Sequence, residues 1–235
     1  MKSHNLPIYC NHKKVQRIMN LLNLKVEQHH KNSFSTYKGE IGKVAKNLLK
    51  RNFKAKKPFK KMGTDITEFN CTFGKAYLSL IVDMYNNEIV SWILSRPPDL
   101  EMVMQTIGKM EDVLPNECKT ILHSDQGWHY QTKQYVNKLK ELKIKQSMSR
   151  KGNCNDNGPT ESIFGVTKNN MFYGKEIQFK TFEDLKKAIE DYVYWNNHVR
   201  PIKRLGYLSP VEFKRKQVRK YDKIKQIKVV PFFGV

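Results

Sequence analysis

Three strand-like runs, the second of them strongly apolar, follow one another between residues 62 and 95, and they limit the folds open to this chain. The runs cover residues 62–70, 75–83 and 88–95, with Phe73-Gly74 and Asn86-Asn87 in the short connections. Connections this short join antiparallel strands, so we expect an antiparallel meander. After Pro97-Pro98 the pattern alternates: we expect helices at 100–113 and 132–142 and strands at 119–124 and 144–148. This order predicts an α/β fold, a mixed sheet with helices on both faces.

Helix signals also mark the remaining parts of the chain. Pro159 suits the first turn of a helix, and apolar spacing predicts another helix at about 182–198. Ser209 and Glu212 form a capping-box pattern at the start of a last short helix. Residues 11–24 are expected to form an amphipathic helix. We therefore predict three parts: a basic helical N-terminal arm at 1–57, a core at 58–216, and a basic tail at 217–235 with a strand near 224–230.

The formal net charge of +21 is concentrated at the two ends of the chain. Residues 1–61 carry 16 basic and 2 acidic side chains, and residues 201–235 carry 10 and 2. Repulsion of this size favours a polyanionic partner, which points to nucleic acid; a solvated basic surface is the alternative. There is no 18-residue apolar run, no signal peptide and no Gly-x-x-x-x-Gly-Lys loop, so we expect neither a membrane nor ATP as partner. The four scattered cysteines indicate a reducing, cytoplasmic location.

Basic residues in the N-terminal arm are candidate contacts to DNA phosphates. Lys13, Lys14 and Arg17 line one face of the helix at 11–24, and Lys56 and Lys57 belong to a basic linker. A packed helix and a spacer without specific contacts are the competing interpretations.

Three carboxylates, distant in sequence, are the candidate catalytic residues. Asp65 and Asp125 each lie at or near the end of an expected strand, and Glu161 lies in the first turn of the helix that Pro159 opens. Carboxylate oxygens are the ligands that Mg²⁺ prefers, and two such ions stabilise both the attacking and the leaving oxygen of a phosphodiester. If the three side chains meet, the chain can hold divalent metal for phosphoryl transfer on DNA. A single Asp at the end of a strand is more often a capping or turn residue.

Several neighbours of these carboxylates are candidates for supporting roles. Lys168 shares a helix face with Glu161 and could meet the same DNA backbone, although an exposed surface lysine is the simpler alternative. His123 could orient Asp125 or contact DNA, or be a hydrogen-bonded structural histidine. Lys151 is a further candidate DNA contact. We interpret three other acidic residues as structural or supporting: Asp83, Asp99 and Asp156, with Asp99 as a helix cap.

At these residues the sequence resembles the integrase-core (DDE) transposases of bacterial insertion sequences, of the orfB type, which are related to retroviral integrases. The matching blocks are Thr64-Asp65-Ile66-Thr67, His123-Ser124-Asp125-Gln126-Gly127-Trp128, Ser149 to Glu161, Glu161 to Lys168, and Trp195-Asn196-Asn197 through Leu205-Gly206-Tyr207-Leu208-Ser209-Pro210. The 35 residues between Asp125 and Glu161 match the spacing of that family.

The resemblance implies a ribonuclease-H-like core and a catalytic triad of Asp65, Asp125 and Glu161 that binds two Mg²⁺ or Mn²⁺ ions. It implies a DNA polynucleotidyl transferase that cleaves element ends with water and then joins the freed 3′-hydroxyl to another strand. The implied partners are double-stranded DNA, further copies of the chain assembled on it, and an upstream-frame helix-turn-helix protein, in a bacterial cytoplasm near the nucleoid.

Two departures from the family pattern keep other functions open. Only the last helix of the usual helix-turn-helix region is present, at residues 11–24, and Asn169-Asn170 replaces an acidic residue common after Lys168. The first departure allows a truncated, catalytically silent DNA-binding remnant that inhibits intact copies. A ribonuclease-H-type nuclease is a third possibility, and it would cleave RNA–DNA hybrids without needing basic ends.

Overall fold

The computed structural model describes residues 11–24, 44–115, 118–151, 153 and 156–218. The chain separates into two compact units, Met1–Thr36 and Tyr37–Val235. The described residues of the expected arm therefore fall into different units, with 11–24 in the first and 44–57 in the second. The strand expected near 224–230 lies outside the described residues. In the portion of the chain that is described, no helix is both long and apolar enough to cross a membrane.

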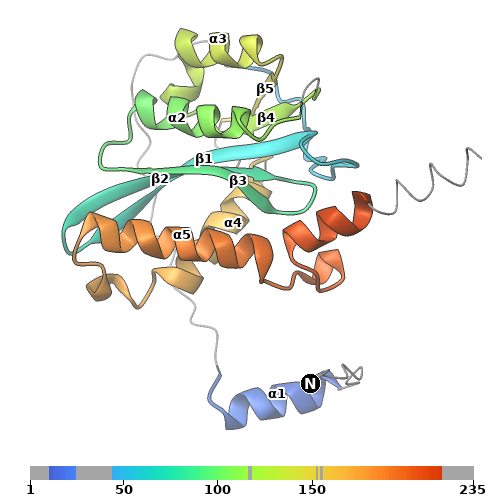
Figure 1. Cartoon of the computed structure of the whole chain (residues 1–235), viewed down its shortest axis with the longest axis vertical. Helices are drawn as coiled ribbons and strands as arrows, with labels where there is room; N and C mark the ends of the chain where they lie inside the picture. Colours follow the sequence, from blue (N-terminus) through green and yellow to red (C-terminus); the bar gives the residue numbers. More distant parts are fainter. Residues whose placement is uncertain (1–10, 25–43, 116–117, 152, 154–155, 219–235) are drawn as a thin grey trace, which may run out of the picture. The chain divides into compact units, whose positions relative to one another are not determined.

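The second unit is built on a five-stranded mixed sheet (Figure 1). Its strands are β1 (Lys61–Cys71), β2 (Gly74–Asp83), β3 (Glu88–Ser95), β4 (Ile121–Ser124) and β5 (Lys145–Met148). Their order across the sheet is β3-β2-β1-β4-β5. β1, β2 and β3 pair antiparallel, whereas β4 pairs parallel with both β1 and β5. The expected meander and the mixed sheet are both confirmed.

Helices cover both faces of this sheet, as Figure 1 shows. The helices α2 (Leu100–Glu111) and α3 (Lys133–Glu141) pack on one face, and α4 (Gly158–Met171) and α5 (Phe182–His198) pack on the other. Successive residues of a strand point to opposite faces, so Ile81 of β2 joins the core under α2 and α3, while its neighbours Leu80 and Val82 join the core under α4 and α5. A strand buried on both sides has to be apolar almost throughout, and β2 is.

Side-chain caps fix where the helices begin. Asp99 accepts a hydrogen bond from the Met102 backbone N–H at 2.9 Å and starts α2, as predicted. Ser209 and Glu212 form the predicted capping box, with Ser209 N–H donating to Glu212 Oε2 at 2.8 Å and Glu212 N–H donating to Ser209 Oγ at 3.3 Å. These caps are local in sequence, which is why the helix starts could be predicted.

The end of α5 is hydrogen-bonded to the start of β3. Asn197 accepts from the Ile89 backbone N–H and donates to the Ile89 carbonyl, both at 2.9 Å. Asn196 donates to the Asn87 carbonyl at 3.3 Å, and Arg204 donates to Asn87 Oδ1 at 2.7 Å. The buried side chains of Asn197 and Asn196 thus hydrogen-bond backbone groups of β3 and of the β2–β3 turn. In this turn Asn87 has a φ of 64°.

Residues 44–57 of the expected basic arm include a segment that packs against the core. Leu49 is buried, and Ala45 packs against the core under α2 and α3. The Leu48 N–H donates to Ser147 Oγ at 2.9 Å, and the Ala45 N–H contacts Met148 Sδ at 3.3 Å. The sequence pattern missed this because the partners lie about 100 residues later in the chain.

The first unit contains α1 (His12–Leu21) among its described residues. Asn11 caps this helix, as expected, by accepting from the Lys13 N–H at 3.1 Å. No residue of α1 is buried. Its apolar side chains, Val15, Ile18 and Leu21 among them, are exposed.

Candidate active site

Asp65 lies within β1, rather than at the end of its strand as expected, and Asp125 is the first residue after the parallel neighbour β4. The β1–β4 pairing places Gly63 beside His123, and each carboxylate lies two residues beyond its strand's member of that pair. Side chains two residues apart in an extended strand point the same way. Both residues are half-buried.

The pKa of Asp65 is affected by burial and by the charges of the other two carboxylates. Desolvation by the surrounding protein raises this pKa well above its usual value, and the negative charges of Asp125 and Glu161 raise it further. Desolvation also raises the pKa of Asp125, against the hydrogen bond that its Oδ1 accepts from the Gly127 N–H at 2.8 Å. A site that disfavours its own negative charges in this way is one that a cation would stabilise.

The first turn of α4 brings the third carboxylate to this edge. Asn157, at the N-cap position, directs its side chain to β1 and donates to Asp65 Oδ2 at 3.2 Å. The Asn157 carbonyl in turn accepts from the N–H groups of Thr160 at 3.0 Å and Glu161 at 3.1 Å. Asn157 therefore joins Asp65 to the turn that carries Glu161, whose side chain is exposed.

The donor set suits a hard divalent cation. Asp65, Asp125 and Glu161 offer only oxygen atoms, and Mg²⁺ is commonly held by a few carboxylates while water and substrate phosphate complete its shell. Among the described residues, no group of three or more His, Cys, Asp and Glu side chains is arranged to hold a metal ion. The fit of these carboxylates to a cation therefore rests on the chemistry of their oxygen atoms.

The position of His123 favours a hydrogen-bonded structural histidine among the roles considered for this residue. The side chain is fully buried, with Nδ1 2.8 Å from Ser147 Oγ and Nε2 2.9 Å from the Asp156 carbonyl. Burial lowers the pKa of His123, which favours the neutral ring. We assign Nε2–H as donor to the carbonyl and Nδ1 as acceptor from Ser147. Direct contact between His123 and DNA is incompatible with this position.

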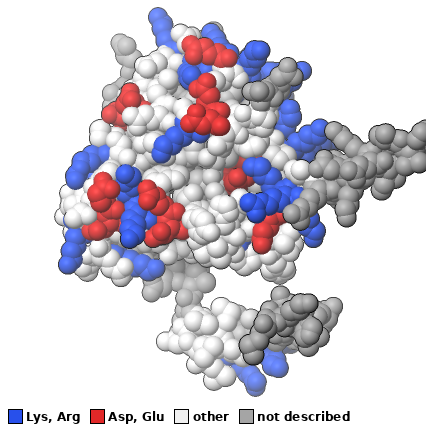
Figure 2. Space-filling view, viewed as in Figure 1, with Lys and Arg blue, Asp and Glu red and all other residues white. Residues whose placement is uncertain are grey.

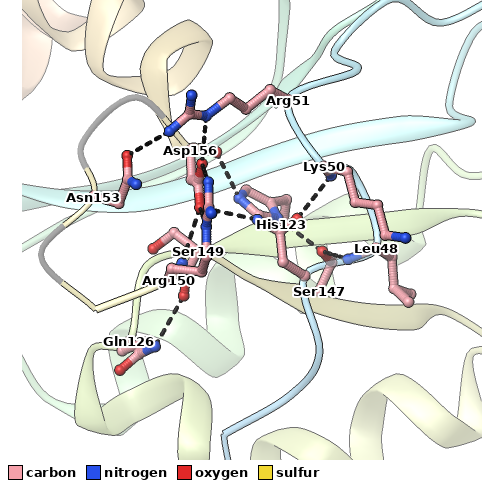
Figure 3. A network of polar contacts seen from close by, with 11 residues as sticks. Leu48, Lys50, Arg51, His123, Gln126, Ser147, Ser149, Arg150, Asn153 and Asp156 are labelled. Carbon is pink, nitrogen blue, oxygen red and sulfur yellow. Dashed lines mark hydrogen bonds and ion pairs between the residues drawn. The ribbon is translucent and has the colours of Figure 1, made fainter.

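Asp156 lies in a network of polar contacts with the loop after β5 and with residues before β1 (Figure 3). Its carboxylate accepts from Arg150 Nε at 2.7 Å, Arg51 Nε at 2.9 Å and Asn47 Nδ2 at 3.1 Å. Arg150 and then Arg51 hold the pKa of Asp156 far below its usual range. Asp156 therefore binds two arginines that the sequence analysis did not single out, Arg51 and Arg150. These contacts are consistent with the supporting role expected for Asp156.

Lys168 lies two turns after Glu161 on α4. Its ammonium nitrogen is 5.4 Å from the centre of the Phe69 ring of β1, and burial of the side chain lowers its pKa. Phe164, one turn before Lys168, is buried in the core under α4 and α5. Lys168 is therefore a half-buried lysine that lies against β1.

The other predicted basic residues are exposed. Lys13, Lys14 and Arg17 lie on α1 in the first unit, and Lys56, Lys57 and Lys151 lie in loops of the second. On the face of the second unit seen in Figure 2, basic and acidic side chains alternate. Their contact with DNA stays a prediction.

Comparison with known proteins identifies relatives that match most of the chain. Residues 55–154 and 161–218 each match the family described as Integrase core domain. An uncharacterized transposase-like protein of Haemophilus influenzae is 48% identical over 211 residues, covering 88% of this chain and 94% of that protein. The putative transposase InsK for insertion sequence element IS150 of Escherichia coli is 43% identical over 204 residues, covering 87% of this chain and 71% of that protein.

Solved structures agree on the fold. The catalytic core of HTLV-2 integrase in complex with magnesium superposes with a TM-score of 0.54 at 16% identity, covering 66% of this chain and 96% of that one. The catalytic core of BIV integrase gives a TM-score of 0.53 at 18% identity, covering 69% and 99%. The mixed sheet with helices on both faces is thus the ribonuclease-H-like fold. With the sequence matches, this shows that the chain belongs to the integrase-core family and is a transposase of the insertion-sequence type.

Proposed function

We propose that Asp65, Asp125 and Glu161 are the catalytic carboxylates of this transposase and hold two Mg²⁺ or Mn²⁺ ions. The observation that carries the proposal is that the charges of Asp125, directly after β4, and of Glu161, in α4, both raise the pKa of Asp65 in β1. Such an arrangement destabilises the ionised side chains unless cations compensate them, so the edge is suited to binding metal.

The reaction supported by this edge is cleavage of DNA at the element ends by water, followed by attack of the freed 3′-hydroxyl on another strand. Two bound ions would stabilise charge on the attacking and leaving oxygens of the phosphodiester. The protein's own part is to hold the carboxylates in place: the Gly127 N–H fixes Asp125, and Asn157 fixes Asp65 relative to the first turn of α4.

The proposed substrate is double-stranded DNA, in agreement with the insertion-sequence transposases among the relatives. Lys168 of α4 and Lys151, shortly before α4 in sequence, are proposed phosphate contacts. Lys56 and Lys57 extend the basic surface. The basic residues of α1, Lys13, Lys14 and Arg17, would add contacts from the first unit. Assembly of several copies on DNA is part of the proposal, and an intasome is among the structural neighbours.

The experiment compares the full chain with Asp125→Asn on a supercoiled plasmid that carries the element ends. We expect Mg²⁺-dependent nicking and strand joining by the wild type, their loss in Asp125→Asn, and nearly unchanged DNA binding in both. Asp191→Asn, which removes one exposed carboxylate from α5, is the matched control and should remain active.

Equal activity of Asp125→Asn and wild type would refute the assignment of the catalytic carboxylates. DNA binding by the wild type without cleavage of any end sequence would instead support the catalytically silent remnant. Cleavage confined to RNA–DNA hybrids would support a ribonuclease-H-type nuclease.

A further inference from the structure

The carboxylate of Asp156 accepts hydrogen bonds from three residues, Arg150, Arg51 and Asn47. Arg150 donates to it from Nε at 2.7 Å, from its second guanidinium nitrogen at 2.9 Å and from its backbone N–H at 3.2 Å. Arg51 and Asn47 add two further hydrogen bonds from the other side. The arginine side chains stand partly at the surface and cover the carboxylate, which is itself 0% exposed.

Residues 45–52, which we call the strap, supply two of these side chains. The strap is bonded to β5, the strand at one end of the sheet, through the backbone N–H groups of Leu48 to Ser147 Oγ and of Ala45 to Met148 Sδ. Lys50 and Arg51 have φ values of 46° and 64°, a left-handed conformation that side chains with a Cβ rarely adopt. Asn47 Oδ1 holds it by accepting from the Lys50 N–H at 2.9 Å. The bend directs the Arg51 side chain to Asp156 (Figure 3).

Asp156 immediately precedes Asn157, which lies at the start of α4 and hydrogen-bonds Asp65 of β1. Its carbonyl is held by His123, two residues before Asp125, and its neighbour Asn157 donates to Asp65 and starts the turn that contains Glu161. A displacement of Asp156 would therefore move Asn157 and Glu161 away from Asp65. Among the contacts of Asp156, those from Arg51 and Asn47 connect this point to the strap, and Arg51 supplies the charged one.

We propose that Asp156 and Arg51 are positioning residues, which set the distance of Glu161 from the other two carboxylates by fixing the start of α4 to the strap. This proposal rests on the proposed metal site. Arg51 and Asp156 both lie outside the two segments that match the Integrase core domain family. The strap precedes the core in sequence, and in this proposal it helps to hold the active site in place.

The test uses the full-length protein with Arg51→Ala, and Lys50→Ala as its matched control. Both changes remove one positive charge from adjacent strap residues with left-handed φ values, but the Lys50 side chain makes none of the contacts shown in Figure 3. Mn²⁺ affinity is measured by titration calorimetry, and amide hydrogen exchange is followed over residues 157–163 and, for comparison, over α5. Asp156→Asn, which keeps the backbone carbonyl for His123, is the second variant.

We expect Arg51→Ala and Asp156→Asn to weaken Mn²⁺ binding by about 10- to 100-fold, the usual effect of removing a residue that supports a metal ligand. Exchange over residues 157–163 should become faster while α5 is unchanged, and Lys50→Ala should match the wild type in both measurements. Arg51→Lys keeps the charge and should restore part of the affinity.

Two results would overturn the positioning role. One is wild-type Mn²⁺ affinity in Arg51→Ala; the other is faster exchange throughout α5, which would indicate general destabilisation. Glu161→Gln, measured alongside, separates this failure from that of the metal site. If Glu161→Gln binds Mn²⁺ as the wild type does, the site itself is wrong and both proposals fall. If Glu161→Gln binds weakly and Arg51→Ala normally, only the positioning role falls.

Discussion

Gly63 of β1 lies directly against Thr160 of α4, so closely that a Cβ atom at residue 63 would overlap Thr160 Oγ1. The same Cβ would lie 3.0 Å from the Met84 side chain. Gly63 is two residues before Asp65, and Thr160 is the residue before Glu161. The missing side chain is therefore what allows the helix carrying one carboxylate to approach the strand carrying another.

Gly63→Ala should push the start of α4 away from β1. Overpacking of this kind costs about 1–3 kcal/mol of the free energy of unfolding, and metal-dependent activity should fall more than stability does. Gly165→Ala, in the same helix, is the control, because a Cβ there meets no atom within 4 Å. Urea unfolding and nicking assays on the two variants measure the effects. Equal activity in both would show that this close approach does not matter.

Asp65→Asn should stabilise the metal-free protein at neutral pH. Because the pKa of Asp65 is raised in the folded state, the folded protein binds this proton more tightly than the unfolded chain does. The stability that the protonated side chain contributes is present at low pH and is lost as the pH rises through the raised pKa. The asparagine variant is neutral at every pH and avoids this loss.

Thermal unfolding in EDTA from pH 4 to pH 8 checks this prediction. The melting temperature of Asp65→Asn should exceed that of the wild type at pH 8, and the difference should shrink towards pH 4. Added Mg²⁺ should raise the melting temperature of the wild type more than that of the variant. A variant less stable than the wild type at pH 8 in EDTA would contradict the raised pKa.

Lys168→Met should weaken DNA binding and make it less dependent on salt. Methionine keeps the apolar stem against Phe69 but removes the charge, so one lost phosphate contact should reduce the slope of log affinity against log salt by about 0.9. Lys140→Met removes an exposed charge from α3 on the other face of the sheet. Fluorescence anisotropy at several salt concentrations distinguishes the two, and identical slopes would exclude Lys168 as a contact.

Asn197→Ala should destabilise the fold without touching the carboxylates. The change leaves the buried N–H and carbonyl of Ile89 without their partners, at roughly 1–3 kcal/mol for each group. We expect a loss of roughly 2–4 kcal/mol in urea unfolding. His198→Ala, at the exposed neighbouring position, should cost far less. A similar loss in both variants would argue against the pairing of Asn197 with Ile89.

Local patterns predicted most of the secondary structure because each signal and its partner lie close together in the chain. Asp99 reaches Met102, and Ser209 reaches Glu212, each within one helical turn. The connections from β1 to β2 and from β2 to β3 are so short that they can join only antiparallel strands. The packing of the strap was not predicted because its partners, Ser147, Met148 and Asp156, follow about 100 residues later.

By itself, the sequence determined the order of strands and helices, the basic character of the chain and the residue types suited to metal chemistry. These properties depend on neighbouring residues and on composition. Only the tertiary structure decided that β4 lies parallel to β1 with Asp65 and Asp125 at matching positions, that His123 is buried, and that Arg51 reaches Asp156. Such facts depend on which distant surfaces pack together, and packing is decided by the shape and volume of the whole core.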